Sequence, residues 1–73
     1  MARIEVKSEV TGTVWKIEKA VGDKVAEYDD IMILESMKME IPAPAPADGT
    51  VVEITVAEGV AVEEGQVLAI VET

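Results

Sequence analysis

The chain has 73 residues, which is enough for one domain and too few for two, so we expect residues 1–73 to form a single domain. Hydrophobic residues make up 49% of the chain, which allows a packed core and argues against wholesale disorder. Cysteine and histidine are absent, which excludes disulfides, thiol chemistry, the common nucleophile–base pairs and most transition-metal sites. We therefore expect no metal site and no catalysis by this chain alone.

The acidic composition limits the expected partners. Asp and Glu number 15 against 6 Lys and Arg, a formal net charge of −9 that repels nucleic acid and anionic membranes. Solubility accounts for most of this charge, and docking to basic protein surfaces is the more specific interpretation. Because the sequence has neither a transmembrane-length apolar segment nor an apolar signal region, the expected location is the cytoplasm. The start at Met1 without an upstream linker suggests a free-standing subunit, although an excised domain would look similar.

Strands dominate the predicted secondary structure. In chain order, they are expected at residues 13–18, 31–34, 50–56 and 67–71. The first and third are rich in Val, Ile and Thr and alternate apolar with polar residues, and we expect Trp15 to pack in the core. The second and fourth are short apolar runs typical of buried strands. Gly22 and Gly59 indicate turns after the first and third strands.

The segment at residues 41–47 places proline at alternate positions. Proline forces an extended backbone on itself and on the residue before it. A flexible linker is one interpretation, but the position inside a repetitive domain favours an edge strand whose N–H groups would face outward.

An internal repeat joins these elements. Shifting the sequence by 37 positions superimposes residues 1–36 on residues 38–73. The identical pairs are Ile4 and Ile41, Gly12 and Gly49, Thr13 and Thr50, Val14 and Val51, Ile17 and Ile54, Ala20 and Ala57, Gly22 and Gly59, Val25 and Val62, Glu27 and Glu64, Ile33 and Ile70, and Glu35 and Glu72. The matches include turn glycines and core positions alike, so each half is one version of a common unit.

The repeat predicts an all-β fold: a flattened antiparallel β-barrel or sandwich of two quasi-symmetric halves, a barrel-sandwich hybrid. Neither half has enough strands to bury its apolar face alone, so the two are expected to pack face to face. Approximate two-fold symmetry then places the link between the halves, at Lys38, at one pole of the domain and the chain ends at the other.

The link between the halves reads Glu-Ser-Met-Lys-Met-Glu, residues 35–40. A strand ends at Ser36 and another begins near Met39, so Lys38 lies in a tight hairpin turn. Such turns favour Asn-Gly or Gly-Gly, because their central residues need positive φ. Met-Lys is unfavourable there, which indicates selection for something other than turn stability.

Two interpretations of this lysine compete. In the simpler one, Lys38 is an ordinary solvated turn residue, and Met37 and Met39 reach back to the core. In the other, a modifying enzyme encloses a protruding lysine between two flexible apolar methionines. The position of the motif at the centre of the repeat favours the second.

This motif resembles the attachment motif of biotinyl domains, in which the lysine of Met-Lys-Met takes the cofactor. The likeness extends to Gly-Thr-Val-Trp-Lys-Ile at residues 12–17, Gly-Asp-Lys-Val at 22–25, Asp-Gly-Thr-Val at 48–51 and Gly-Gln-Val-Leu at 65–68. The resemblance implies covalent biotin on Lys38, with Met37 and Met39 as recognition residues and Glu35, Ser36 and Glu40 as weaker candidates.

The sequence departs from the family pattern at three places. Ser36 replaces the alanine often found before Met-Lys-Met, and Val60 replaces the aspartate that follows Gly22 in the first half. Residues 28–30 stand where the second half has Gly-Gln, so the first-half turn is expected to need Asp29 in a left-handed conformation.

The resemblance also implies a function. A biotin–protein ligase would load Lys38, a biotin carboxylase would carboxylate the cofactor, and a carboxyltransferase would pass the carboxyl group to an acceptor. A lipoyl carrier of a dehydrogenase complex shares the fold, although lipoyl domains commonly have Asp-Lys at the hairpin. An unmodified interaction domain is the alternative of a different class.

Overall fold

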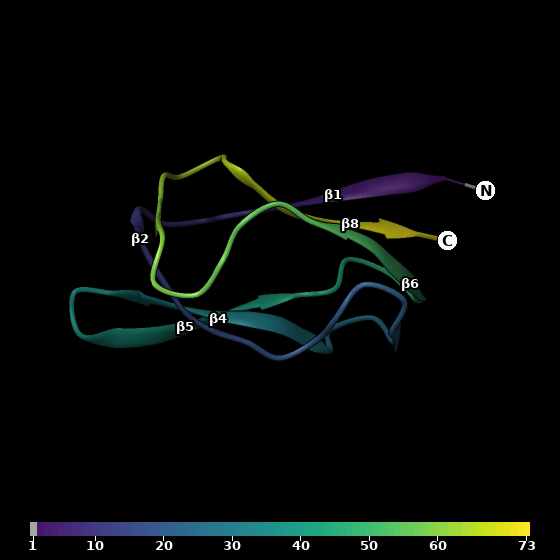
Figure 1. The fold of residues 1–73 in the computed structure, drawn as a ribbon, viewed down its shortest axis with the longest axis horizontal. Coiled ribbons are helices and arrows are strands. Elements are labelled where there is room, and N and C mark those ends of the chain that lie inside the picture. Colours follow the sequence, from purple (N-terminus) through teal and green to yellow (C-terminus); the bar gives the residue numbers. More distant parts are fainter. Residues whose placement is uncertain (1) are drawn as a thin grey trace.

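The computed structural model describes residues 2–73 and is built from strands (Figure 1). The strands are β1 (Arg3–Lys7), β2 (Gly12–Ile17), β3 (Lys24–Val25), β4 (Asp30–Ser36), β5 (Met39–Pro44), β6 (Gly49–Ile54), β7 (Ala61–Val62) and β8 (Val67–Glu72). Between residues 2 and 73 there is no helix that could cross a membrane. The predicted all-β class is confirmed, and so are the four predicted strands, with ends shifted by one or two residues.

The strands form two four-stranded antiparallel sheets that face each other, with the orders β1-β8-β6-β3 and β5-β4-β2-β7 (Figure 1). The two central strands of each sheet come from one half of the repeat, and its two edge strands come from the other. The halves therefore exchange their edge strands as well as packing face to face. This exchange gives each half the neighbours that it could not supply for itself.

The core lies between the sheets and is almost entirely aliphatic. It consists of Val6, Val14, Val25, Ile31, Met32, Leu34, Ala43, Ala45, Val51, Val62, Leu68, Ala69 and Val71. Because β4 and β8 are the second strand of their sheets and carry the longest apolar runs, they supply the largest share of these residues. Burial of this surface is the main term that favours the folded state.

Trp15 is not in the core, contrary to expectation, and 51% of it is exposed. The register of β2 against β4 shifts between Val14 and Lys16, so Trp15 is the extra residue of a β-bulge. A bulge changes the alternation of side chains along its strand. Val14 takes the inward position, at 1% exposure, and Trp15 is displaced to the surface.

The left-handed residue of the first-half turn is Tyr28, with φ of 73°, and not Asp29. Tyr28 is equivalent in the repeat to Gly65, with φ of 86°. Asp29 instead accepts a hydrogen bond at Oδ2 from the backbone N–H of Ala26, 2.9 Å away. Gln66, its equivalent, accepts one from Glu63 over the same distance. The side chain at this position closes the turn, and the residue before it takes the unusual backbone angle.

The proline segment forms the edge strand β5 and the loop after it, as predicted. Ser36 and Met39 face each other across the β4–β5 turn, and the register then pairs Ile33 with Pro42. In a two-residue hairpin the pair that closes the turn is hydrogen bonded, and bonded pairs then alternate with unbonded pairs along the two strands. Counted from Ser36 and Met39, the pair of Ile33 and Pro42 is an unbonded one. The nitrogen of Pro42 faces the open edge, where no N–H is needed.

The two poles of the domain carry different features. The domain measures 36 × 18 × 18 Å, and the β4–β5 hairpin lies at the end of the long axis opposite both ends of the described chain (Figure 1). Near the termini, the Thr73 N–H donates to the carbonyl oxygen of Ala2 at 2.9 Å, and Arg3 contacts Glu72 at 3.4 Å. The prediction that Lys38 and the chain ends occupy opposite poles is confirmed.

Candidate functional site: the β4–β5 hairpin

The tip of the hairpin has an unfavourable backbone for its sequence. Met37 and Lys38 have φ of 53° and 64°, the left-handed values of a type I′ turn. A left-handed conformation costs a residue with a Cβ about 1 kcal/mol or more, and glycine or asparagine avoids most of that cost. The structure thus confirms that the turn is held in a conformation that Met-Lys disfavours.

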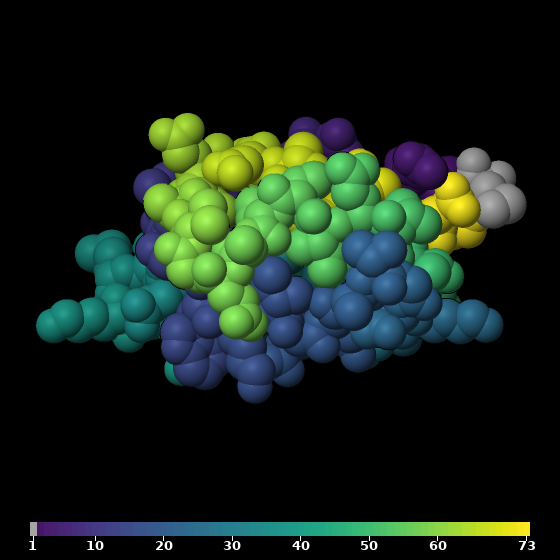
Figure 2. All heavy atoms as spheres, viewed as in Figure 1, coloured from purple at the N-terminus to yellow at the C-terminus, as the bar shows by residue number. Residues whose placement is uncertain are grey.

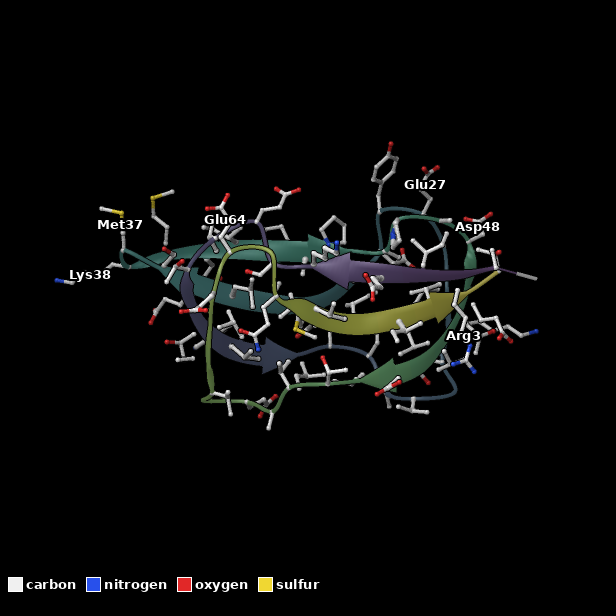
Figure 3. All side chains as sticks on the ribbon, turned by 90° about the horizontal axis from the view of Figure 1, so that it is seen from above. Arg3, Glu27, Met37, Lys38, Asp48 and Glu64 are labelled. Atoms are coloured by element: carbon white, nitrogen blue, oxygen red, sulfur yellow. The ribbon has the colours of Figure 1, made fainter. Side chains whose placement is uncertain are left out.

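The side chains at the tip project into solvent, beyond the rest of the surface (the teal atoms at the left end of Figure 2). Met37 is 91% exposed and Met39 is 62% exposed, so neither methionine reaches back to the core. Lys38 is exposed and points away from the body of the domain (Figure 3). Among residues 2–73, the ion pairs within 4.0 Å involve Arg3, Lys7 and Lys16 and do not include Lys38. The amine is accessible to an enzyme from outside.

The flanking residues occupy the base of the same hairpin. Glu35 and Glu40 lie directly opposite each other in the β4–β5 ladder, and both are exposed. Like charges at directly opposed positions are mutually destabilising, so this pair does not strengthen the hairpin. Ser36 is half-buried, and its hydroxyl donates to the carbonyl oxygen of Thr11 at 2.9 Å. Ser36 therefore fixes the hairpin to the body of the domain and is not presented at its tip.

Thr11, directly before β2, and Gly12, the first residue of β2, also help to hold the base of the hairpin. The sequence alone did not indicate that role for them. Thr11 accepts the Ser36 hydroxyl at its carbonyl oxygen, and its own hydroxyl accepts the Glu64 N–H at 3.3 Å. Gly12 lies against Glu35, because a Cβ at Gly12 would clash with the Glu35 carbonyl oxygen. The repeat gives a signal for Gly12, since Gly49 is its equivalent and makes the same close approach to Glu72. The signal for Thr11 is absent, because Asp48 replaces it in the second half.

The arrangement presents one amine to solvent at the end of the domain. Among residues 2–73 no group of three or more Asp and Glu side chains is placed to hold a metal ion. The side chains at the tip are the thioethers of Met37 and Met39 and the amine of Lys38, and the carboxylates of Glu35 and Glu40 lie at its base. A compact β-domain that exposes one lysine at its pole is typical of protein domains that carry a covalently attached group.

Comparisons with known proteins agree with this class. Residues 5–71 match a family model described as "Biotin-requiring enzyme". A biotin/lipoyl attachment protein of Bacillus subtilis is 43% identical over 63 residues, which cover 86% of each chain. A biotinylated protein TB7.3 homolog of Mycobacterium leprae is 33% identical over 67 residues, 92% of this chain and 94% of its own.

A solved structure supports the fold. The crystal structure of the Kluyveromyces lactis urea carboxylase matches 99% of this chain with a TM-score of 0.93 and 36% identity. The matched part is 6% of that carboxylase, so the chain corresponds to one small part of a much larger enzyme. The chain defines a biotin- or lipoyl-type attachment domain. It belongs to the family of biotin-requiring enzymes.

Proposed function

We propose that residues 1–73 act as one biotin carboxyl carrier domain, with biotin joined to Lys38. The observation that carries this proposal is an exposed amine, without an ion-pair partner among residues 2–73, at the pole opposite the termini. The membership of the family and the likeness to a urea carboxylase favour biotin as the attached group. The exposed lysine fits an amide attachment, because neither burial nor a carboxylate partner would have to be removed first.

The residues of the hairpin have distinct proposed roles. Lys38 forms the amide: its amine attacks the carboxyl carbon of biotin that the ligase has activated, the C–N bond forms as the bond to the activating group breaks, and the nitrogen gives up a proton. Met37 and Met39 offer apolar surface that a biotin–protein ligase grips while it encloses the lysine. Glu35 and Glu40 add charge that a basic ligase surface contacts, and Ser36 keeps the base of the hairpin fixed.

The domain itself contributes position and reach. When bound, biotin supplies a ring nitrogen that accepts and releases a carboxyl group. Attachment to the tip confines that group near the domain and raises its effective concentration at a biotin carboxylase and at a carboxyltransferase. The net charge of −9 favours docking to basic rims on these enzymes and suits a carrier in the cytoplasm without a reaction of its own.

Intact mass after co-expression with a biotin–protein ligase tests this proposal. We expect the wild-type chain to gain the mass of one biotinyl group and to bind streptavidin. Lys38→Arg should abolish both while the thermal unfolding curve is unchanged, because the side chain at the tip makes no buried contact. Lys24→Arg, in β3 outside the hairpin, is the matched control and should be loaded like the wild type.

The same measurement separates the alternatives. A lipoyl adduct after co-expression with a lipoyl ligase, with no biotin adduct from the biotin ligase, would identify a lipoyl carrier. A chain that neither ligase modifies would be an interaction domain. A folded Lys38→Arg variant that still bound streptavidin would place the attachment at another lysine.

A further inference from the structure

A cleft opens on the long side of the domain between the two edge strands β1 and β5. Its volume is about 350 Å³. Residues 5–9 line one wall and residues 42–46 line the other, and these two segments are equivalent in the repeat. Leu34 and Ile41 contribute apolar surface between them. The cleft therefore lies on the approximate two-fold axis, and its two walls would be alike if their sequences were.

The backbone of β1 is unpaired on the side that faces this cleft, because β1 is an edge strand. The Thr73 N–H bonds to the Ala2 carbonyl, which makes these opposed residues a bonded pair. Pairs alternate along an antiparallel ladder, so Glu5 and its opposite residue Ile70 form an unbonded pair. The N–H and C=O of Glu5 are consequently directed outward.

The same alternation continues past the bulge between Val6 and Lys7. The Ser8 N–H donates to the Gln66 carbonyl oxygen at 2.9 Å, so Ser8 is directed inward. Lys7, directly before Ser8, then directs its N–H group outward. The edge of β1 offers unpaired backbone donors and acceptors at Glu5 and Lys7.

The two walls differ in their outward backbone N–H donors, which an added strand needs for hydrogen bonding. Proline occupies the outward positions of the β5 wall, at Pro42, Pro44 and Pro46, and their equivalents in the β1 wall are Glu5, Lys7 and Glu9. Proline cannot donate a backbone hydrogen bond, so the β5 edge is closed to a further strand. The β1 edge, with the same geometry, is left open.

We propose that the open edge of β1 is a docking site for an extended segment of a partner protein. The segment extends the sheet next to β1, and its alternate apolar side chains enter the cleft and contact the half-buried Ile41. This mode uses backbone hydrogen bonds for affinity and side-chain pockets for specificity. It is independent of the modification of Lys38, because the cleft and the hairpin tip share no residue.

Charge identifies the kind of segment that fits. On the outer face of the edge, Lys7 lies 3.7 Å from Glu5, while Glu9 extends the acidic character of this wall. Together with the net charge of −9, this favours basic residues at the outward positions of the docked segment. A second copy of this chain is disfavoured as the occupant, because two copies would bring their negative charges together. The partner segment is therefore extended and alternates apolar with basic residues.

Peptide titration of the whole chain tests the proposal, with a capped hexapeptide of alternating valine and lysine as the probe. The double variant Glu5→Pro with Lys7→Pro copies the residues of the β5 wall and removes two edge donors. The double variant Glu5→Ala with Lys7→Ala makes the same charge change and keeps both donors. We expect the proline variant to bind about tenfold more weakly or worse, and the alanine variant to stay within about threefold of the wild type.

Hydrogen exchange keeps the test decisive if the proline variant does not fold. In the wild type, the amides of Glu5 and Lys7 should exchange fast and become protected by the peptide, while the amide of Val6 is protected throughout. Absent binding, equal weakening by both double variants, or unchanged affinity of a folded proline variant would each overturn the proposal. The proposal would also be overturned if the free chain formed a dimer and the proline variant did not, because the edge of β1 would then bind a second copy of this chain. Lys38→Arg should bind the peptide like the wild type, which separates this test from that of the carrier function.

Discussion

Tyr28 and Gly65 occupy equivalent positions in the two halves and share the same left-handed backbone, with φ of 73° and 86°. Each also donates its N–H to the segment that follows the neighbouring edge strand of the same sheet: Tyr28 to the carbonyl of Ala45 at 2.9 Å, and Gly65 to that of Ser8 at 2.8 Å. The N–H groups of Ala45 and Ser8 donate in return to the carbonyls of the next residues, Asp29 and Gln66. These paired bonds hold the backbone of both positions in the left-handed conformation. Glycine suits it, and tyrosine is strained there.

Tyr28→Gly should therefore stabilise the domain by about 0.5–1 kcal/mol, the relief of strain less the greater freedom of glycine in the unfolded chain. Little packing is lost, because Tyr28 is 76% exposed. Urea unfolding measures the change. Gly65→Ala is the reciprocal variant and should lose stability. A loss of stability in Tyr28→Gly would show that the ring contributes more contact than its exposure indicates.

Met37→Asn should make the hairpin more stable and a poorer substrate for a biotin–protein ligase. Asparagine tolerates the left-handed conformation and is favoured at this position of a type I′ turn, so we expect a gain of about 0.5–1 kcal/mol. The exposed thioether is lost, and with it the proposed contact to the ligase. The rate of biotin loading and urea unfolding should move in opposite directions.

Met37→Leu is the control for this variant, because it retains an apolar side chain and the backbone strain. It should load faster than Met37→Asn and unfold like the wild type. Equal loading of the asparagine variant and the wild type would remove Met37 from the recognition surface.

Gly12→Ala and Gly49→Ala form a matched pair. Each adds a Cβ that clashes with a strand carbonyl oxygen, that of Glu35 in the first case and that of Glu72 in the second. Each should lower the free energy of unfolding by about 1–3 kcal/mol, because the backbone must move apart. Only Gly12 lies against the base of the β4–β5 hairpin, so only Gly12→Ala should also slow biotin loading. Equal loading of the two variants, measured under conditions where both are folded, would argue against a positioning role for Gly12.

Val60→Asp should supply a hydrogen bond that the second half lacks. In the first half, Asp23 Oδ2 accepts the Ala20 N–H at 2.8 Å and closes its turn. Val60 is the equivalent of Asp23, and its backbone N–H already bonds to the Ala57 carbonyl oxygen at 3.2 Å. The aspartate should accept the Ala57 N–H and add about 0.5–1 kcal/mol to the free energy of unfolding.

The net charge of the chain opposes part of this gain, so the unfolding curves are best compared at moderate salt. Val60→Asn tests the geometry without the charge and should be stabilising as well. If neither variant is more stable than the wild type, the second-half turn does not have the geometry of the first.

The repeat made most of the fold predictable. Identical residues at equivalent positions, such as Gly12 and Gly49, mark the same backbone requirement twice, and a symmetric arrangement follows from it. The opposition of Lys38 to the termini needed nothing more than that symmetry. The exchange of edge strands was not predictable, because a repeat identifies equivalent positions and does not say which copy supplies the neighbouring strand.

The sequence predictions for individual residues were wrong where a single residue interrupts the regular pattern of a strand or turn. Trp15 has the alternation of an inward residue, but the bulge between Val14 and Lys16 changes the phase of the strand. Tyr28 was overlooked because asparagine and aspartate tolerate left-handed angles better, which made Asp29 the natural candidate. At the hairpin, the residues of the tip were evident from sequence, whereas the support from Thr11 depends on a contact over 25 positions.

The exchange of edge strands between the halves determines when, during synthesis, the lysine hairpin is supported by a complete fold. The sheet that faces the hairpin sheet contains β8 as a central strand, and β8 contributes Leu68, Ala69 and Val71 to the core. A growing chain that has exposed the lysine hairpin but not yet residues 67–72 leaves β1 without its neighbour and half the interior open to water. If Lys38 is the attachment residue, as we propose, it is held by the complete fold only after residues 67–72 have been made. We therefore expect chains that lack these residues to be poor targets for a modifying enzyme.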